Sequence, residues 1–220
     1  MPGERSGFFQ SIIESANSRR LESKTGTFLR EHDLTVHTTD RPSYPCLILS
    51  THPTIWDTVF WRTNENMYHA INSAASRKTG VEGLDMMLAR TIPVYQGEKR
   101  LRTYDLIARI ISHGGQVVLN PSGETACSND VPSPEEIKLG AMYRSLQRSD
   151  IRTVVPAIVW VDGEICIDGT VGSASKVNII FSTQPMDLSE VDFRLDRAPP
   201  NMALKICREW QRLYAEASGV

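Results

Sequence analysis

The chain has 220 residues, of which 40% are hydrophobic and 23% charged, and its formal net charge is −2. This length suits one sizeable domain with its own core, and the composition is that of an ordinary soluble globular protein. A net charge so close to zero gives no electrostatic reason to expect a nucleic-acid partner.

The four cysteines are scattered along the chain, with no C-x-x-C pair and no histidine at the spacing of a zinc site; they are Cys46, Cys127, Cys166 and Cys207. We therefore expect neither a disulfide framework nor a bound metal, and reduced thiols in a cytoplasmic setting. Residues 1–20 lack the apolar core of a signal peptide, and no apolar run of about 18 residues could span a membrane.

The first half of the chain predicts helices around one strand. We expect an N-terminal helical segment over residues 1–32. Its apolar group would either pack on the domain or dip into a lipid surface, and consists of Phe8, Phe9, Ile12 and Ile13. The continuously apolar run 46–50 predicts a strand that is buried on both faces. Proline suits the first position of a helix, so a helix is expected to open at Pro53 with His52 as its cap.

Helices and strands alternate through the middle of the chain. Residues 101–112 predict a helix, because their apolar members fall on one face. Residues 116–120 predict a second buried strand, which the Pro121–Gly123 turn ends. Ser133 and Glu136 have the spacing of a capping box, which predicts a helix over 134–148.

The last third adds two strands and a closing helix. Residues 153–161 and 176–182 predict strands, and Asp162-Gly163 is a hairpin signal that would lead into a strand over 164–167. A helix is expected over 199–218. The alternation predicts a single α/β domain, with a mostly parallel central sheet covered by helices on both faces. Functional residues of such sheets gather beyond the carboxyl ends of the strands.

His52 and Asp57 are the candidate catalytic residues. A neutral imidazole can take a proton from a hydroxyl group when a partner holds its ring in the useful tautomer. Asp57, five residues further on, can accept the Nδ1 proton and leave Nε2 as the base. No nucleophilic serine accompanies the pair, so the nucleophile would be the hydroxyl of the substrate. The alternative is a capping histidine followed by an aspartate near the positive end of a helix.

Short sequence blocks follow one another in a set order. These are THPTIWD at 51–57, IPVYQ at 92–96, NPSGET at 120–125, KLGA at 138–141 and VPAI at 155–158. They resemble, in turn, the motifs N-H-x-x-x-x-D, G-x-I-F-I-x-R, F-P-E-G-T-R-S, K-x-G-A and V-P-V-x-I. In order and spacing, residues from about 46 to 185 resemble the PlsC-type phospholipid and glycerol acyltransferases, which include the 1-acylglycerol-3-phosphate acyltransferases.

The resemblance implies an enzyme that transfers a fatty acyl group to a hydroxyl of a glycerolipid-like acceptor. The donor would be an acyl thioester, on either coenzyme A or acyl carrier protein, and no further cofactor would be needed. His52 would be the general base, oriented by Asp57. Backbone amides near the turn formed by Pro121, Ser122, Gly123 and Glu124 would stabilise the oxyanion. Without the neighbouring blocks, a plain strand-to-loop junction would be the favoured interpretation of this turn. Peripheral membrane contact is compatible with such substrates.

Two positions depart from the family pattern. The arginine of the second block, the family's phosphate anchor, aligns with Gln96. In the third block Thr125 replaces the arginine, and Ser122 stands at the glutamate position while Glu124 comes two residues later. Neither glutamine nor threonine supplies the charge that a phosphate requires.

Nearby cations offer a substitute for the missing arginines. Lys99, Arg100 and Arg102 could bind a phosphate, or they could be the solvated start of a helix. The departures therefore leave open a second hypothesis, in which the same chemistry acts on a non-phosphorylated acceptor such as a polyol, a hydroxylated lipid or a secondary metabolite. A third is a non-catalytic lipid- or acyl-binding homologue, which the presence of both His52 and Asp57 argues against.

Overall fold

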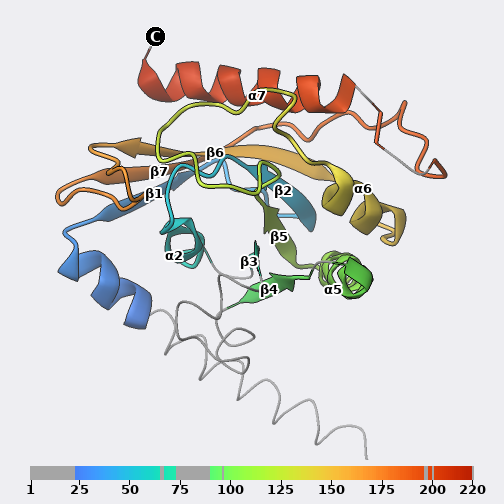
Figure 1. Ribbon diagram of the computed structural model, residues 1–220, viewed down its shortest axis with the longest axis horizontal. Helices are drawn as coiled ribbons and strands as arrows, with labels where there is room; N and C mark the ends of the chain where they lie inside the picture. The colour runs from blue at the N-terminus through green and yellow to red at the C-terminus, as the bar shows by residue number, and fades with distance from the viewer. Residues whose placement is uncertain are drawn as a thin grey trace, which may run out of the picture.

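A seven-stranded sheet runs through the structure, a computed structural model that describes residues 23–64, 67–72, 90–95, 97–195, 198–199 and 201–219. The strands are β1 (Thr35–Thr39), β2 (Cys46–Ser50), β3 (Met67–Asn72), β4 (Thr91–Val94), β5 (Gln116–Leu119), β6 (Val154–Asp162) and β7 (Lys176–Phe181). Their order across the sheet is β1-β7-β6-β2-β5-β3-β4 (Figure 1).

Most neighbouring strands are parallel. β2 pairs with β5 and β6, and β3 pairs with β4 and β5, all in the parallel sense. β7 runs antiparallel to β6, and β1 runs parallel to β7. The predicted fold class, a single α/β domain with a mostly parallel sheet, is confirmed.

Helices cover both faces of the sheet. They are α2 (Asp57–Trp61), α5 (Arg100–Ser112), α6 (Gly140–Gln147) and α7 (Asn201–Ser218), with a helical stretch at 23–31 and a single 3₁₀ turn, η1 (Gly97–Lys99). α7 lies over one face, and α2 and the 23–31 helix lie below the other (Figure 1). The layers on both faces confirm the predicted arrangement.

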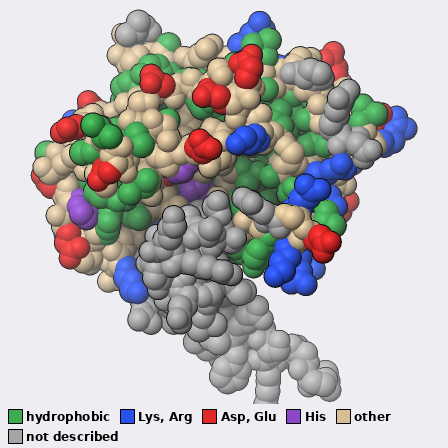
Figure 2. All heavy atoms as spheres, viewed as in Figure 1, with side chains coloured by type: hydrophobic (Ala, Val, Ile, Leu, Met, Phe, Trp, Pro, Cys, Tyr) green, Lys and Arg blue, Asp and Glu red, His purple; other side chains and the backbone are tan. Residues whose placement is uncertain are grey.

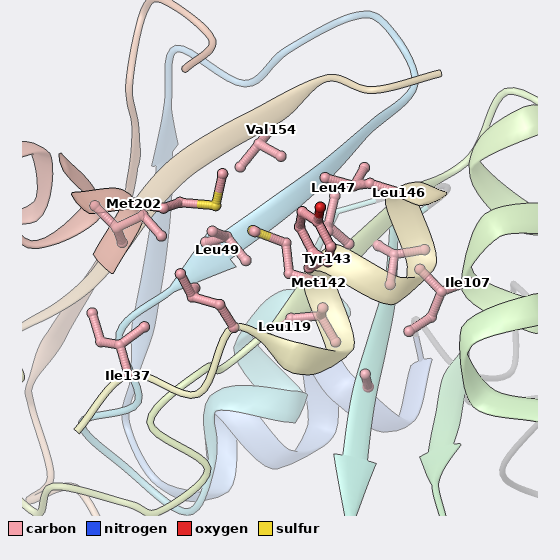
Figure 3. Packing of buried hydrophobic residues seen from close by; sticks show 14 of the residues in the cluster. Leu47, Leu49, Ile107, Leu119, Ile137, Met142, Tyr143, Leu146, Val154 and Met202 are labelled. Carbon is pink, nitrogen blue, oxygen red and sulfur yellow. The ribbon is translucent and has the colours of Figure 1, made fainter. Parts of the chain in front are cut away.

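β2 explains why both faces need a cover. Leu47 and Leu49 pack into the apolar cluster that includes residues of α5, α6 and α7 (Figure 3), whereas Cys46 and Ile48 belong to the cluster on the opposite face with α2. Successive side chains of a strand point to opposite faces, so a continuously apolar strand is buried on both. The prediction for residues 46–50 is confirmed.

The helix expected over 134–148 begins only at Gly140. One half of the capping box forms, because the backbone amide of Ser133 donates to the Glu136 carboxylate at 2.7 Å. The amide of Lys138, however, donates to the carbonyl of Pro121 at 2.8 Å. This bond ties the segment to the turn after β5, so the helix starts six residues later than its local signals indicate.

The hairpin after β6 also differs from the prediction. Residues 164–167 form no strand of their own, and only an isolated bridge joins Ile165 to Val171. The partner that returns along β6 is β7. Gly163 is needed at the turn, since a Cβ there would lie 2.1 Å from Oγ of Ser175.

The predicted helical segment is confirmed for residues 23–31, while Phe8, Phe9, Ile12 and Ile13 lie outside the described residues. Within the described ranges, no helix combines the length and the apolar character that crossing a membrane requires.

Trp210 provides a test of how firmly α7 is attached. Its ring is fully buried, and Nε1 donates to the carbonyl of Leu49 in β2 at 3.1 Å. Trp210→Ala should lower the free energy of unfolding by about 3–5 kcal/mol, and Trp210→Phe by about 1–3 kcal/mol through the lost donor. Urea unfolding measures both. Leu204→Ala, on the exposed side of the same helix, is the control and should stay within about 0.5 kcal/mol. Equal effects at the two positions would contradict this packing.

Candidate active site

The candidate site lies beyond the carboxyl end of β2. His52 follows Ser50, the last residue of the strand, by two positions. Because β2 is flanked in parallel by β5 and β6, the segments that follow all three strands emerge at the same edge of the sheet. This is the edge at which sites of mostly parallel sheets are expected.

His52 and Asp57 form the predicted pair. Nδ1 of His52 lies 2.8 Å from Oδ2 of Asp57. A carboxylate can only accept, so the proton of this bond belongs to Nδ1, and Nε2 is left as the unprotonated nitrogen. The histidine side chain is 21% exposed while that of Asp57 is fully buried. The bond to Asp57 therefore fixes the orientation of the ring and leaves Nε2 as its basic nitrogen.

Thr54 completes the environment of the carboxylate. Its hydroxyl donates to Oδ1 of Asp57 at 2.6 Å, so each carboxylate oxygen has one side-chain donor. Burial raises the pKa of Asp57 above its ordinary value, and the hydrogen bonds from His52 and Thr54 oppose that rise by stabilising the ionised form. Loss of either donor would leave a buried carboxylate under-compensated.

The prediction that a helix opens at Pro53, with His52 as its cap, is wrong. α2 begins at Asp57, and residues 51–54 have no regular structure. The physical reason is Thr54, whose hydroxyl oxygen accepts the amide of Trp56 at 3.1 Å and so forms a turn before the helix. His52 consequently lies in the loop that leads out of β2.

Neighbouring strands hold this loop in place. The hydroxyl of Thr51 accepts the amide of Val159 in β6 at 3.1 Å, and the carbonyl of Thr51 accepts from the Asn120 side chain at 2.9 Å. The carbonyl of His52 accepts the amide of Ala126 at 2.8 Å. The backbone on either side of the imidazole is thus tied to the segments that follow β5 and to β6 itself.

Thr125 lies on the other side of the imidazole. Its Oγ1 is 3.1 Å from Nε2 of His52. The sequence suggested an acceptor-binding position that had lost its arginine, and the structure instead shows a hydroxyl against the basic nitrogen. Asp57, His52 and Thr125 form a carboxylate–imidazole–hydroxyl series, the order found in hydrolase triads. In the sequence, the one signal for the contact between Thr125 and His52 is that Thr125 follows the end of β5, which is parallel to β2.

The turn after β5 approaches the site mainly through its backbone. Gly123 has a φ of +74°, which favours glycine, and its amide donates to the carbonyl of Asn120 at 3.0 Å. The hydroxyl of Ser122 donates to the carbonyl of Glu124 at 3.3 Å. Pro121 is buried and its carbonyl binds Lys138. Neither the Ser122 nor the Glu124 side chain takes part in the series formed by Asp57, His52 and Thr125.

The candidate cations lie further along the same edge. Lys99 ends η1, and Arg100 and Arg102 begin α5; all three are exposed, and Gln96 lies outside the described residues. Three strand spacings separate β4, which precedes them, from β2, a lateral distance of about 14 Å. Figure 2 shows Lys and Arg side chains gathered where α5 lies in Figure 1, to one side of the histidine near the middle of this face.

The remaining sequence blocks lie in β4, in β6 and at the start of α6. Ile92 to Val94 form the end of β4, residues 155–158 lie inside β6, and Gly140 opens α6. β4 was not predicted from the sequence.

His69 was missed by sequence reasoning because β3, on which it lies, was not predicted either. The side chain is buried, and Nε2 donates to Oδ1 of Asn120. Burial, the largest cause, lowers the pKa of His69 to about 4, with a smaller Coulombic contribution from His52. Nδ1 has no hydrogen-bond partner among the described residues. A neutral His69 thus orients the Asn120 side chain that holds the carbonyl of Thr51.

A separate hollow of about 410 Å³ lies beside the start of β6, with Arg152, Met186 and Phe193 in its lining. It is at the opposite end of the sheet from His52 and does not belong to this site. In the described part of the chain, no three His, Cys, Asp or Glu side chains are grouped so as to hold a metal ion.

Comparison with known proteins supports the fold. No protein-family model matches the sequence, and no curated protein matches it at a significant level. Among solved structures, the chain is similar to the crystal structure of the 1-acyl-sn-glycerophosphate acyltransferase PlsC from Thermotoga maritima. The TM-score is 0.60 at 15% sequence identity, over 96% of this chain and 90% of that one. At this identity the likeness shows a shared fold.

The burial of His69 predicts a dependence of stability on pH. Its pKa falls from 6.5 to about 4 in the folded state, so between these values the unfolded chain binds a proton that the folded chain does not. The free energy of unfolding should therefore fall as the pH is lowered through this window, by at most about 1.4 kcal/mol per unit.

His69→Gln retains an amide donor near Asn120 and removes the titration. We expect the stability of the unmodified protein relative to this variant to decrease steadily from pH 7 to pH 4.5, measured by urea unfolding at each pH. His37→Gln, at an exposed position of β1, is the control and should follow the unmodified protein. A difference between His69→Gln and the parent that does not vary with pH would rule out a buried neutral His69.

Proposed function

We propose that this protein is an acyltransferase, which moves an acyl group from an acyl thioester to a hydroxyl group with His52 as the general base. The observation that carries the proposal is the His52–Asp57 pair, joined at 2.8 Å with the carboxylate buried and the imidazole partly exposed. The fold supports it, because a solved structure of similar fold is that of a 1-acyl-sn-glycerophosphate acyltransferase.

The chemistry follows from the hydrogen bonds. Nε2 of His52 removes the proton from an attacking hydroxyl as its oxygen adds to the thioester carbonyl. The imidazolium that forms is stabilised by Asp57, whose second oxygen is held by Thr54 so that the carboxylate does not rotate. The imidazolium then protonates the departing thiolate. Thr54 is a positioning residue in this scheme.

The tetrahedral oxyanion needs donors on the side facing the turn after β5. The amides of Gly123 and Ala126 are already bonded to the carbonyls of Asn120 and His52. We assign the oxyanion contact to the backbone between them, at Glu124 and Thr125, because this stretch carries the hydroxyl that lies on His52. The carrier of the thioester is coenzyme A or acyl carrier protein.

An exposed apolar rim favours a lipid-like substrate. Ile55, three residues after His52, is half exposed, and Ile167 is fully exposed. The two belong to adjoining segments, since the amide of Ile55 donates to the carbonyl of Gly169 at 3.0 Å. Aliphatic side chains exposed beside the catalytic loop would contact an acyl chain or a lipid surface. Peripheral membrane association through this rim is part of the proposal.

The acceptor that fits best carries no phosphate near its reacting hydroxyl. At the position of the family's third-block arginine, Thr125 offers a neutral hydroxyl. Desolvation of a phosphate dianion against neutral groups would be uncompensated. The alternative is a phosphate that reaches Lys99, Arg100 or Arg102, which follow β4, three strand spacings from β2.

The catalytic pair makes the first prediction for activity. His52→Ala should reduce turnover by ~10²–10⁴-fold, and Asp57→Asn should reduce it through loss of the correct tautomer. Because the two residues act as a unit, the turnover of the double variant should be no lower than that of the less active single variant. Thr54→Val, which keeps Asp57 and His52, should cost less than either.

The assay uses labelled acyl-CoA and acyl carrier protein thioesters with a panel of hydroxyl acceptors, followed by mass analysis of the products. Unfolding curves of each variant separate lost activity from lost folding, since removal of His52 leaves the buried Asp57 with one donor fewer. Wild-type turnover in a folded His52→Ala protein would show that the mechanism is incorrect.

The acceptor is tested by neutralising the three cations. Lys99→Gln, Arg100→Gln and Arg102→Gln, singly and combined, should leave the KM of the best acceptor unchanged if that acceptor has no phosphate. Arg109→Gln, exposed near the end of the same helix, is the matched control for net charge. A KM that rises about tenfold or more in the combined variant, but not in the control, would favour the phosphorylated acceptor.

A further inference from the structure

The hydroxyl of Thr125 is oriented toward His52 as a nucleophile is toward its base. Nδ1 of His52 donates its N–H to the carboxylate of Asp57, so Nε2 of the neutral ring can only accept. The bond of 3.1 Å between Oγ1 of Thr125 and this nitrogen therefore has the threonine as donor. The proton that would have to leave for the oxygen to attack is already directed at the base.

Contacts on the other side of Thr125 hold this orientation. Its methyl carbon faces Gly169, where an added Cβ would lie 3.4 Å from it. The next residue, Ala126, donates its amide to the carbonyl of His52 at 2.8 Å. The bond from Ala126 to His52 and the methyl group on the side of Gly169 are both consistent with a hydroxyl directed at the imidazole.

This arrangement has a consequence for a direct transfer. The hydroxyl of an external acceptor would need the nitrogen that Thr125 occupies. The neighbouring hydroxyl of Ser122 offers no equivalent, because it donates to the carbonyl of Glu124 within its own turn. A hydroxyl belonging to the protein is therefore already in the position from which the first attack starts.

We propose that Thr125 is a catalytic nucleophile and that the acyl group passes through a covalent ester on its oxygen. The inference rests on the proposed acyl-transfer function and deepens it. Thr125, His52 and Asp57 then act as a triad whose acyl-enzyme intermediate is transferred to the acceptor.

The reaction balances in two steps. In the first, Nε2 of His52 takes the hydroxyl proton of Thr125, and Oγ1 adds to the thioester carbonyl. The carbon–sulfur bond then breaks, and the thiolate leaves with the proton from His52. In the second, His52 takes the proton of the acceptor hydroxyl, whose oxygen attacks the threonine ester. The ester bond to Oγ1 breaks, and His52 returns the proton to Thr125. Asp57 stabilises both imidazolium ions.

Trapping the intermediate tests the proposal. The full-length protein is incubated with decanoyl-CoA without acceptor, quenched in acid from milliseconds to minutes, and analysed by intact mass and by fragmentation of the tryptic peptide 110–138. We expect one added acyl group located on Thr125, in the parent and in Thr125→Ser. It should be absent from Thr125→Val, which keeps the methyl contact with Gly169, and from His52→Ala.

Cys127 requires a control because its sulfur also lies close to Gly169. Neutral hydroxylamine removes a thioester from cysteine but leaves an oxygen ester, so the Thr125 adduct should survive this treatment. It should also persist in Cys127→Ser. An adduct that disappears under either condition belongs to the cysteine and overturns the assignment to threonine.

Steady-state kinetics provide the second readout. With an acceptor that the parent enzyme uses, initial rates against donor and acceptor should give parallel double-reciprocal lines, as expected for a covalent intermediate. Thr125→Val should lose more than about 10³-fold in the rate of transfer, and Thr125→Ser should retain most of it. Transfer by Thr125→Val within threefold of the parent, or absence of any adduct on Thr125 in the parent, overturns the proposal.

Failure of this inference differs from failure of the proposed function. If the parent and Thr125→Val transfer the acyl group equally, His52 acts directly on the acceptor, and the acyltransferase function stands. If the parent transfers nothing to any acceptor but forms the Thr125 ester that water hydrolyses, the triad stands and transfer to an acceptor is rejected.

Discussion

The buried carboxylate of Asp57 is the constraint on which the rest of the site depends. A charge removed from water must be compensated by hydrogen bonds, and here one donor comes from His52 and the other from Thr54. The first bond fixes the tautomer of the imidazole, and the hydroxyl that makes the second also accepts the amide of Trp56 in the turn before α2. Both the local fold and the chemistry therefore follow from the need to satisfy one acidic group that has no exposure to solvent.

The sheet supplies the rigid support for this pair. Thr51 is held by the amide of Val159 in β6 and by Asn120 after β5, and Asn120 is itself oriented by His69 of β3. These residues come from three strands adjacent to β2 or one step beyond it. A loop anchored in this way positions a catalytic group more reproducibly than a loop tied only at its ends. The low pKa of His69 fits this structural role, because it keeps the buried ring uncharged. A positive charge on His69 would be unfavourable both for its burial and for its interaction with His52.

The structure gives Thr125, in the segment after β5, a different role from the one that its sequence suggests. Compared with the acyltransferase pattern, the threonine is a lost arginine and therefore a lost phosphate contact. In the structure, the same residue puts a hydroxyl on the basic nitrogen of His52. At this position the chain therefore offers a hydroxyl to the imidazole, where the family pattern has a cation.

The sequence by itself determined the features that arise from neighbouring residues. Residues 46–50 and 116–119 are strands because continuous apolar runs must be buried on both faces, and α5 follows from its helical periodicity. His52 and Asp57 are five residues apart, so their pairing could also be inferred from the chain. Only the tertiary structure brought together Thr125 and His52, which are 73 residues apart, and His69 and Asn120, which are 51 apart. Those contacts depend on the order of strands in the sheet, and hydrophobic patterning encodes which residues are buried but not which strands become neighbours.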